Sequence, residues 1–303
     1  GYERVLESST YMAELSGKHK QSESVFNIFG IFRSLKRQFG QVTVNFGKPL
    51  LLQEFMDKQL PEWQQLTEIP SVHLSNTCLH LAENLATRIN QSVAVKATNL
   101  VAVALLSTTR QSIEEQYLLD QIELLREIAR KCGPLECSIT NATSKEILEQ
   151  AIEISGLSRT EHQFGTIVSA SPEQSITLTY NLNNVVHVYA LPSVVARFVR
   201  TETRTNKDAL ATFVRTLFPF LKSEMFLPWD ILHLETVLDT IVKSLSELGL
   251  ITTNDRQITI PSPESLEYNR LQDIASITDP TLERFYIVMA LLQQSNQPSI
   301  KAL

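Results

Sequence analysis

The chain has 303 residues, of which 43% are hydrophobic and 20% are charged, and its formal net charge is −6. This length is enough for two or three domains with buried cores. The charge is uneven, because residues 1–50 carry a net +3 and the remainder carries −9. An acidic remainder excludes broad, charge-driven binding to nucleic acid as a main function.

The cysteines and the hydropathy of the chain indicate its redox compartment and its relation to membranes. Cys78, Cys132 and Cys137 are an odd number without a C-x-x-C pair. This predicts a reducing compartment, and neither a disulfide framework nor a zinc site. No apolar run reaches the roughly 18 residues that a membrane-spanning helix needs, so any membrane contact would be peripheral. The chain starts at Gly1 inside an element-like run, and we expect it to be a fragment of a longer protein.

Residues 24–39 predict an amphipathic helix, because apolar side chains recur at three-residue steps beside a cationic cluster. Aromatic side chains next to Lys and Arg suit a helix that lies in the headgroup region of an anionic membrane. A lid helix or a core helix is the alternative. The residues expected to contact the membrane are Phe26, Phe29, Phe32, Arg33, Lys36 and Arg37.

Residues 42–46 alternate between apolar and polar side chains and stop at Gly47 and Pro49, which predicts a strand that leaves a sheet. Residues 1–6 also alternate, so strand, helix and strand follow each other within fifty residues. This order predicts the last part of an α/β domain over residues 1–70.

A helical module is predicted over residues 71–160. Apolar periodicity predicts helices over residues 80–106, 112–128 and 144–154. Gly133 with Pro134 ends the second of these helices, and Gly156 ends the third.

The remainder, residues 161–303, is predicted to hold a small sheet and a largely helical region. Short strands are expected at residues 165–170, 175–180 and 185–191, and helices at 192–200, 207–225 and 229–248. Residues 249–260 read as two β runs about a turn, and helices followed by such a hairpin are typical of a winged helix. The predicted fold class is therefore mixed α/β.

The sequence contains no complete set of catalytic residues. None of the six histidines has an Asp five positions later, the spacing suited to acyl transfer, and nucleophile-elbow, Walker and dinucleotide motifs are lacking. His187 is predicted to hydrogen-bond Asn183 or Asn184 and fix a turn, with a ligand or catalytic role as the alternative. Residues 217–230 are rich in aromatic side chains, and we expect them to pack between domains, with Lys222 and Glu224 solvated or paired at the rim.

Several of these stretches resemble one family, the large bacterial glycerol-3-phosphate acyltransferases of the PlsB type. The resemblance runs from end to end in collinear order, and residues 217–230 are its most specific part. It is carried by Gly1-Tyr-Glu-Arg-Val5, Val44-Asn-Phe-Gly-Lys-Pro49, Arg88-Ile-Asn90, Tyr180, Asn183-Asn-Val-Val-His187, Leu191-Pro-Ser193 and Leu217 through Asp230.

The resemblance implies an enzyme that transfers an acyl group from acyl-CoA or acyl carrier protein to the 1-hydroxyl of glycerol 3-phosphate. It implies no cofactor. The family's His-x-x-x-x-Asp motif, in which the His acts as general base, would precede Gly1, so the chain alone is expected to be inactive. Tyr2 and Glu3 are similar to the end of a motif near the substrate cleft and are expected to bind substrate.

The implied architecture is the end of an acyltransferase domain followed by a helical C-terminal region with winged-helix-like modules. An enzyme with a soluble anionic substrate and a lipid product works at an interface. We therefore expect the chain at the cytoplasmic face of the bacterial inner membrane, as a peripheral protein without nucleic-acid partners. The alternative is a non-catalytic winged-helix interaction module. Residues 229–248 offer Lys243 as their only Lys or Arg, which does not suit DNA, because phosphate contacts need several Lys and Arg.

Overall fold

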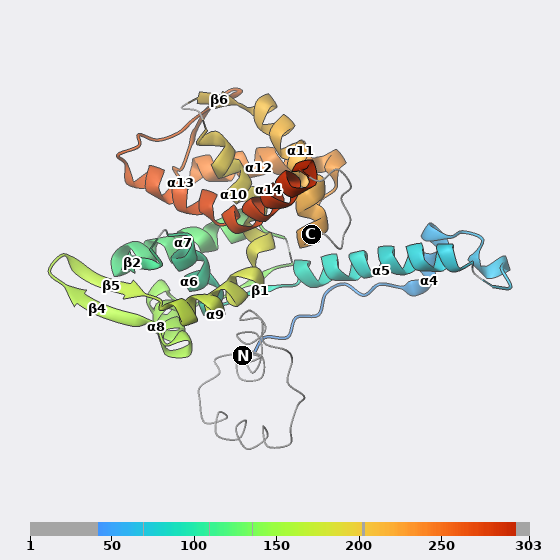
Figure 1. The fold of residues 1–303 in the computed structure, drawn as a ribbon, viewed down its shortest axis with the longest axis horizontal. Helices are drawn as coiled ribbons and strands as arrows, with labels where there is room; N and C mark the ends of the chain where they lie inside the picture. Colours follow the sequence, from blue (N-terminus) through green and yellow to red (C-terminus); the bar gives the residue numbers. More distant parts are fainter. Residues whose placement is uncertain (1–41, 69, 109, 135, 202–203, 295–303) are drawn as a thin grey trace, which may run out of the picture.

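The computed structural model describes residues 42–68, 70–108, 110–134, 136–201 and 204–294, and shows a mixed α/β protein that is mostly helical (Figure 1). Its α-helices are α4 (Leu52–Gln59), α5 (Ser71–Gln91), α6 (Ala97–Leu106), α7 (Glu115–Cys132), α8 (Ser144–Ser155), α9 (Pro172–Asn183), α10 (Val186–Val199), α11 (Lys207–Met225), α12 (Leu234–Glu247), α13 (Leu266–Ser276) and α14 (Asp279–Gln294). Short 3-10 helices cover Trp63–Gln65 and Ile231–His233.

The described strands form small, separate sheets. β1 (Ala94–Val95) pairs in parallel with β3 (Ser138–Ile139). β2 (Ser112–Glu114) and β4 (Ser158–His162) both pair antiparallel with β5 (Gly165–Ser169), so the strand order is β2-β5-β4. In the same way, β6 (Arg204–Asn206) and β7 (Thr252–Asn254) flank β8 (Gln257–Thr259) in the order β6-β8-β7.

Within the described residues, one succession of elements occurs twice. A helix, a short strand, two helices and two final strands occur in this order in residues 97–169 and again in residues 186–259, with β3 inserted between the later helices of the first stretch and a 3-10 helix between those of the second. In both stretches the last strand lies in the middle of its sheet and pairs with the strand that follows the first helix. The helices of each stretch also pack on one another. We call residues 97–169 the first unit and residues 186–259 the second unit.

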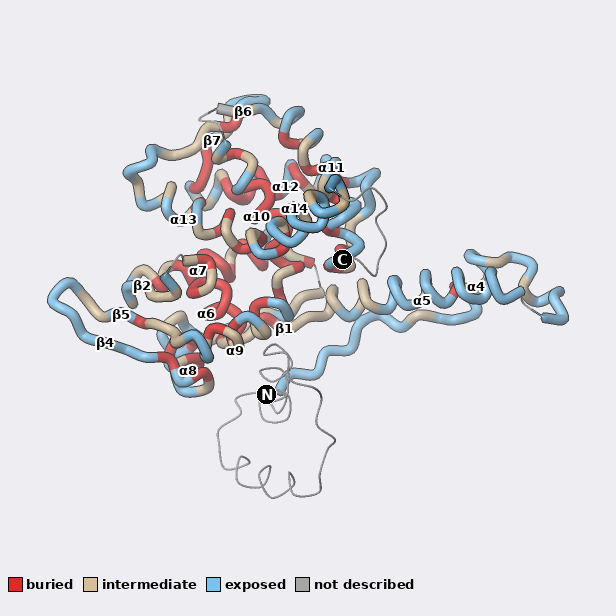
Figure 2. The backbone as a smooth tube through the Cα atoms, viewed as in Figure 1, coloured by how far each residue is buried: buried red, intermediate tan, exposed pale blue. Residues whose placement is uncertain are grey.

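The first helix of each unit lies in the core. α6 is apolar on all sides, and most of its described residues are buried, with Leu100 and Leu105 fully enclosed. α10 is also largely apolar and buried, and it packs against α7, α9, α11, α12 and α13. A helix that is hydrophobic all round is stable only when other elements cover it on every side. Figure 2 shows this buried centre in red, while the hairpin β4–β5 and the pair α4–α5 extend from it into solvent.

Two of the strands predicted in residues 161–303 are wrong. Residues 175–180 lie in α9, because Ser171 caps this helix together with Gln174 and Pro172 occupies its first turn. Residues 185–191 lie in α10, whose run of Val, Tyr and Leu is buried on all sides. A fully buried run has no polar alternation, so its period does not separate strand from helix. The strand predicted at residues 165–170 is confirmed as β5.

Two predictions nearer the N-terminus also need correction. The helix predicted over residues 80–106 is two helices, since α5 ends at Gln91 and α6 begins at Ala97 with β1 between them. Residues 42–46 are not a strand, and Val42, Val44 and Phe46 are 70%, 70% and 93% exposed. The alternation there is real, but residues 42–46 form no backbone ladder with a described strand.

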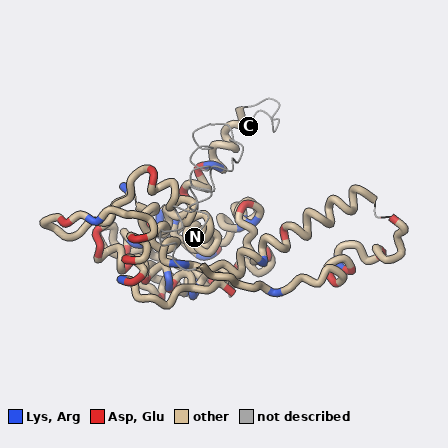
Figure 3. Tube along the Cα trace, turned by 90° about the horizontal axis from the view of Figure 1, so that it is seen from below, with Lys and Arg blue, Asp and Glu red and all other residues tan. Residues whose placement is uncertain are grey.

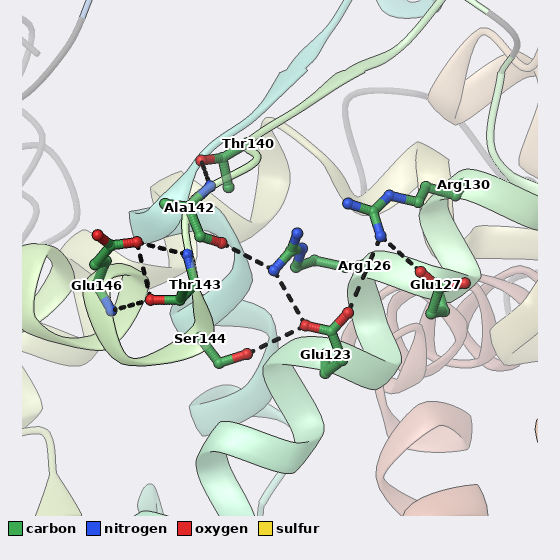
Figure 4. Close-up of polar contacts among 9 residues, drawn as sticks. All are labelled: Glu123, Arg126, Glu127, Arg130, Thr140, Ala142, Thr143, Ser144 and Glu146. Atoms are coloured by element: carbon green, nitrogen blue, oxygen red, sulfur yellow. Dashed lines mark hydrogen bonds and ion pairs between the residues drawn. The ribbon is translucent and has the colours of Figure 1, made fainter.

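The helix ends that were predicted at Gly133 and Gly156 are confirmed. The predicted helix start at Ser112 is wrong, because residues 112–114 form β2 and α7 begins at Glu115. α7 is followed by Gly133, and α8 ends at Gly156, which adopts a left-handed φ of 67°. α11 covers residues 207–225 as predicted, and β7 and β8 form the predicted hairpin. Figure 4 shows how α8 begins: Thr143 and Glu146 cap each other's backbone, and Arg126 of α7 donates to Ala142 O at 2.9 Å. Side chains thus fix where α8 starts and anchor it to α7.

A polar cluster joins α13 to the first unit. Tyr117 Oη donates to Asp273 Oδ2 at 2.7 Å, and Gln121 Nε2 donates to the same oxygen at 3.3 Å. Arg270 and Asp120 form an ion pair at 2.9 Å beside them. Burial raises the pKa of Asp273 to about 6, although the hydrogen bond from Tyr117 and the charge of Arg200 oppose the rise. The cluster therefore fixes α13 on α7 at the cost of a partly buried carboxylate.

Candidate functional site

Four of the described stretches that carry the family resemblance meet at the carboxyl end of α5. Residues 45–49, the last turn of α5, the start of α10 and the end of α11 are linked there by hydrogen bonds. We call this place the junction. Its members come from far apart in the chain, since Asn90 and Met225 are separated by 135 positions.

Residues 45–49 are held against α5 and the β1–β3 ladder. Asn45 Nδ2 donates to Ser92 O at 2.7 Å and to Ser138 Oγ at 2.8 Å. Arg88 donates to Lys48 O at 2.9 Å and to Pro49 O at 2.7 Å. A guanidinium that bridges two successive carbonyls holds the chain in one direction. The segment is thus fixed by specific side chains even though most of its own side chains are exposed.

Gly47 is required by this close approach. A Cβ placed on Gly47 would lie 2.6 Å from Ser92 Oγ and 3.4 Å from Arg88 O. The first distance is shorter than any ordinary contact, so a larger residue would require Ser92 Oγ to rotate away from its hydrogen bond to Arg88 O or the segment to shift away from α5. Beside it, Lys48 and Glu136 form an ion pair at 3.1 Å, but the Lys48 side chain is 82% exposed, so the pair adds little stability.

Asn90 links the last turn of α5 to both α10 and α11. Its Nδ2 donates to Met225 O at 2.8 Å, which satisfies a carbonyl at the end of α11. Its own carbonyl oxygen lies 2.9 Å from His187 Nε2. The neutral imidazole donates here with Nε2–H. One asparagine therefore connects three helices.

The structure gives His187 a packing role. Its side chain is 4% exposed at the start of α10, and its hydrogen bond is to Asn90 O, so the predicted partners Asn183 and Asn184 are wrong. Burial lowers the pKa of His187, while the hydrogen bond to Asn90 O opposes this. A buried imidazole held neutral by desolvation and fixed by a backbone carbonyl fastens α10 to α5.

The end of α11 confirms that part of residues 217–230 packs in the core, while their place between two domains stays a prediction. Phe218 and Leu221 are buried between helices, whereas Glu224 pairs with Arg284 of α14 at 3.6 Å on the surface. Lys222 Nζ donates to Trp229 O at 2.8 Å. The apolar part of this stretch packs, and its charges are paired at the rim, as expected.

A shallow groove of about 570 Å³ borders the junction. One side is the segment of residues 44–48, and the other is Ser92 with the start of β3. No group of three or more His, Cys, Asp or Glu side chains in the described residues is arranged to hold a metal ion. Every helix in the described part of the chain is too short or too polar to cross a bilayer.

The predicted substrate and membrane residues lie outside the described residues. This applies to Tyr2 and Glu3, and to Phe26, Phe29, Phe32, Arg33, Lys36 and Arg37. Sequence reasoning missed the roles of Asn45, Arg88 and Asn90 as the connectors of the junction. The resemblance had already marked these stretches, but nothing in their local pattern shows what each side chain contacts.

The whole chain is similar to known proteins of one kind. It matches the family described as the glycerol-3-phosphate acyltransferase C-terminal region over residues 11–302. Proteins named glycerol-3-phosphate acyltransferase from Pseudomonas fluorescens, Pseudomonas aeruginosa and Pseudomonas savastanoi are 35%, 36% and 35% identical to it over the full chain. The chain covers 36% of the first relative and 37% of the other two.

The chain belongs to the glycerol-3-phosphate acyltransferase C-terminal region family, which the sequence resemblance had predicted. It spans a little over a third of the length of the relatives named here.

Proposed function

We propose that this chain is the C-terminal region of a glycerol-3-phosphate 1-O-acyltransferase that takes its acyl group from acyl-CoA or acyl carrier protein. In this reaction the 1-hydroxyl oxygen attacks the thioester carbonyl, a new ester bond forms and the C–S bond breaks. A general base takes the hydroxyl proton, and the thiol leaves. The product is lysophosphatidic acid, and the reaction is the first step of phospholipid synthesis.

The observation that carries this proposal is the collinear similarity over the full chain to proteins named for this activity. The junction supports it, because four of the described stretches that carry the resemblance bond to one another there. The base of the reaction is not in this sequence, which lacks a His-x-x-x-x-Asp motif. The region therefore supports catalysis without performing it, by fixing the segment of residues 45–49 on α5.

The test is an assay of acyl transfer from palmitoyl-CoA to glycerol 3-phosphate. It compares the full-length protein with the present chain alone. We expect activity in the full-length protein and none in the chain. Activity in neither would contradict the proposal, and activity in the chain alone would mean that it holds a catalytic site of its own.

We also propose that the protein binds peripherally to the cytoplasmic face of the bacterial inner membrane through the residues 24–39 named above. The support is their pattern of aromatic and cationic side chains. Replacing both Phe29 and Phe32 by Ser should reduce cosedimentation with anionic phospholipid vesicles. Unchanged cosedimentation would remove this part of the proposal.

A second candidate function is a non-catalytic interaction module. The element order of the two units, with the last strand central in each sheet, favours winged-helix-like modules. In the winged helices that bind DNA, the third helix enters the major groove, which here would be α8 or α12. α8 and α12 each carry one Lys, no Arg and three acidic residues. Helices with this charge repel phosphates, so a partner of such modules would be a protein.

A further inference from the structure

The pair α4–α5 extends away from the body of the protein as an arm (Figure 1). We define the arm as residues 42–91. α5 has 21 residues and is therefore about 30 Å long. Thr77 is the single buried residue of this fully described helix, and Phe55 is the single one of α4. A helix that is so little buried and is surrounded by water is expected to carry polar side chains on every face.

The composition of α5 does not suit water on all sides. Its 21 residues contain two charged side chains, Glu83 and Arg88. α7, which has 18 residues and is largely buried along one face, contains seven charged side chains. Figure 3 shows α5 with very little red or blue along its length. The less buried helix is thus the less charged one, the reverse of the usual relation between exposure and charge.

The apolar residues of α5 form a stripe. Leu74, Cys78, Leu81, Leu85 and Ile89 recur at steps of four, three, four and four, which places them on one face of the helix. Leu74, Leu85 and Ile89 are 48%, 43% and 71% exposed, and Cys78 is exposed as well.

The rest of the arm covers α5 only in part. His80, which bonds Gln59 at 2.8 Å, lies on a face away from the stripe. Arg88, which bonds the carbonyls of Lys48 and Pro49, follows Leu85 by one turn and borders the stripe. Leu74, Leu85 and Ile89 remain exposed after α4 and residues 45–49 have packed, and an exposed apolar surface of this kind marks a place of contact.

The small number of basic side chains beside the stripe indicates which kind of partner covers it. An interfacial membrane helix carries Lys and Arg along the edges of its apolar face, whereas the one Arg of α5 is bound to backbone carbonyls. The chain covers a little over a third of its relatives and matches their C-terminal region, so a longer preceding part is the nearest available partner. Residues 42–46 lead from that direction and carry the exposed apolar side chains Val42, Val44 and Phe46.

We propose that the stripe of Leu74, Cys78, Leu81, Leu85 and Ile89 docks onto the part of the same polypeptide that precedes this region. The inference rests on the proposed function, because it takes the chain to be the C-terminal part of a longer acyltransferase. The inference names the surface through which this C-terminal region contacts the preceding part of the polypeptide. In the whole protein α5 is then an internal helix. The hydrogen bonds of the junction fix the direction in which α5 leaves the body of this region.

Cys78 lies within the stripe and serves as a native probe. The full-length protein is treated with N-ethylmaleimide, and labelling is followed for the peptide that contains Cys78 by mass spectrometry. The control is a Phe164→Cys variant at the β4–β5 turn, where Phe164 is 82% exposed. If the free energy of docking exceeds about 1.4 kcal/mol, Cys78 should be labelled at least about tenfold more slowly than the cysteine at the control position. In urea both positions should react at similar rates.

A matched pair of variants checks that the stripe itself gives the protection. Leu85→Glu places a charge in the stripe and should speed the labelling of Cys78 about tenfold or more. Leu232→Glu, at a site 84% exposed on the second unit, should leave that rate unchanged. Equal rates in both variants would overturn the assignment of the stripe.

Further outcomes separate the possible occupants. Labelling of Cys78 as fast as the control overturns the proposal. So does protection that needs added anionic phospholipid vesicles, or protection that is lost on dilution, since these point to a membrane or a second copy. Acyl transfer is measured on the same samples. Activity with an unprotected Cys78 overturns the docking alone, and protection without activity supports the docking but overturns the proposed reaction.

Discussion

Asp273 provides a test of the electrostatic reasoning, because it is a carboxylate kept in a partly buried site. Desolvation raises its pKa from 3.8 to about 6, in spite of the hydrogen bond from Tyr117 and the charge of Arg200. We expect Asp273→Asn to stabilise the chain at neutral pH. The amide oxygen can still accept the hydrogen bond from Tyr117, and the buried charge is gone.

The size of the effect follows from the pKa. A rise from 3.8 to about 6 corresponds to a cost of about 3 kcal/mol for ionising the folded protein. Because the folded-state pKa is the higher one, this stabilising contribution of the protonated Asp273 is complete below about pH 4. It is lost as the pH rises through about 6. The variant should therefore match the wild type at pH 4 and exceed it by up to about 3 kcal/mol at pH 8.

The measurement is urea unfolding of the chain by circular dichroism at both pH values. Asp208→Asn is the control, because Asp208 is 72% exposed in an ion pair with Arg256, and its change should stay within about 0.5 kcal/mol at both pH values. If Asp273→Asn destabilises the chain at pH 8, the carboxylate is a net stabilising partner of its arginine neighbours. An equal change at both pH values would also refute the reasoning, since it would not come from ionisation.

Two further predictions concern the junction. Gly47→Ala should destabilise the contact with α5 and speed amide exchange in residues 45–51, because the new methyl group meets Ser92 Oγ at 2.6 Å. Adding Ser92→Ala should restore much of the protection, and a double variant no better than the single one would contradict this cause. Since burial lowers the pKa of His187, the neutral ring stabilises the fold above about pH 6.5. Its stabilising contribution is lost as the pH falls from there towards the lower folded-state pKa. His187→Gln should reduce the acid sensitivity of unfolding between pH 6.5 and 5, and an unchanged pH profile would show that another group causes it.

The helix ends could be predicted from the sequence because their causes are local. Thr143 and Glu146 are three positions apart and cap α8 without help from the rest of the chain. Gly156 ends the same helix because its left-handed backbone conformation is easy for glycine. Asn206 caps α11 through the backbone of Ala209 in the same way. The predicted boundaries of these helices were accordingly correct or within a few residues.

The two strands predicted within residues 175–191 were wrong for the opposite reason. Their Val, Ile, Thr and Tyr content favours strands locally, but α10 is enclosed by other helices that lie far away in the sequence. The same limit applied to His187, whose partner is 97 positions distant rather than in the neighbouring turn. Local propensity is weak compared with the burial of a whole helix.

The sequence by itself determined the family, the local starts and stops of helices, and the lack of a complete catalytic set in this chain. Only the tertiary structure decided that Asn45, Arg88, Asn90 and His187 meet at one junction, and that the stripe on α5 remains exposed. The physical reason is that caps and turns depend on neighbours within about four positions. Which faces become buried depends on contacts across the whole chain.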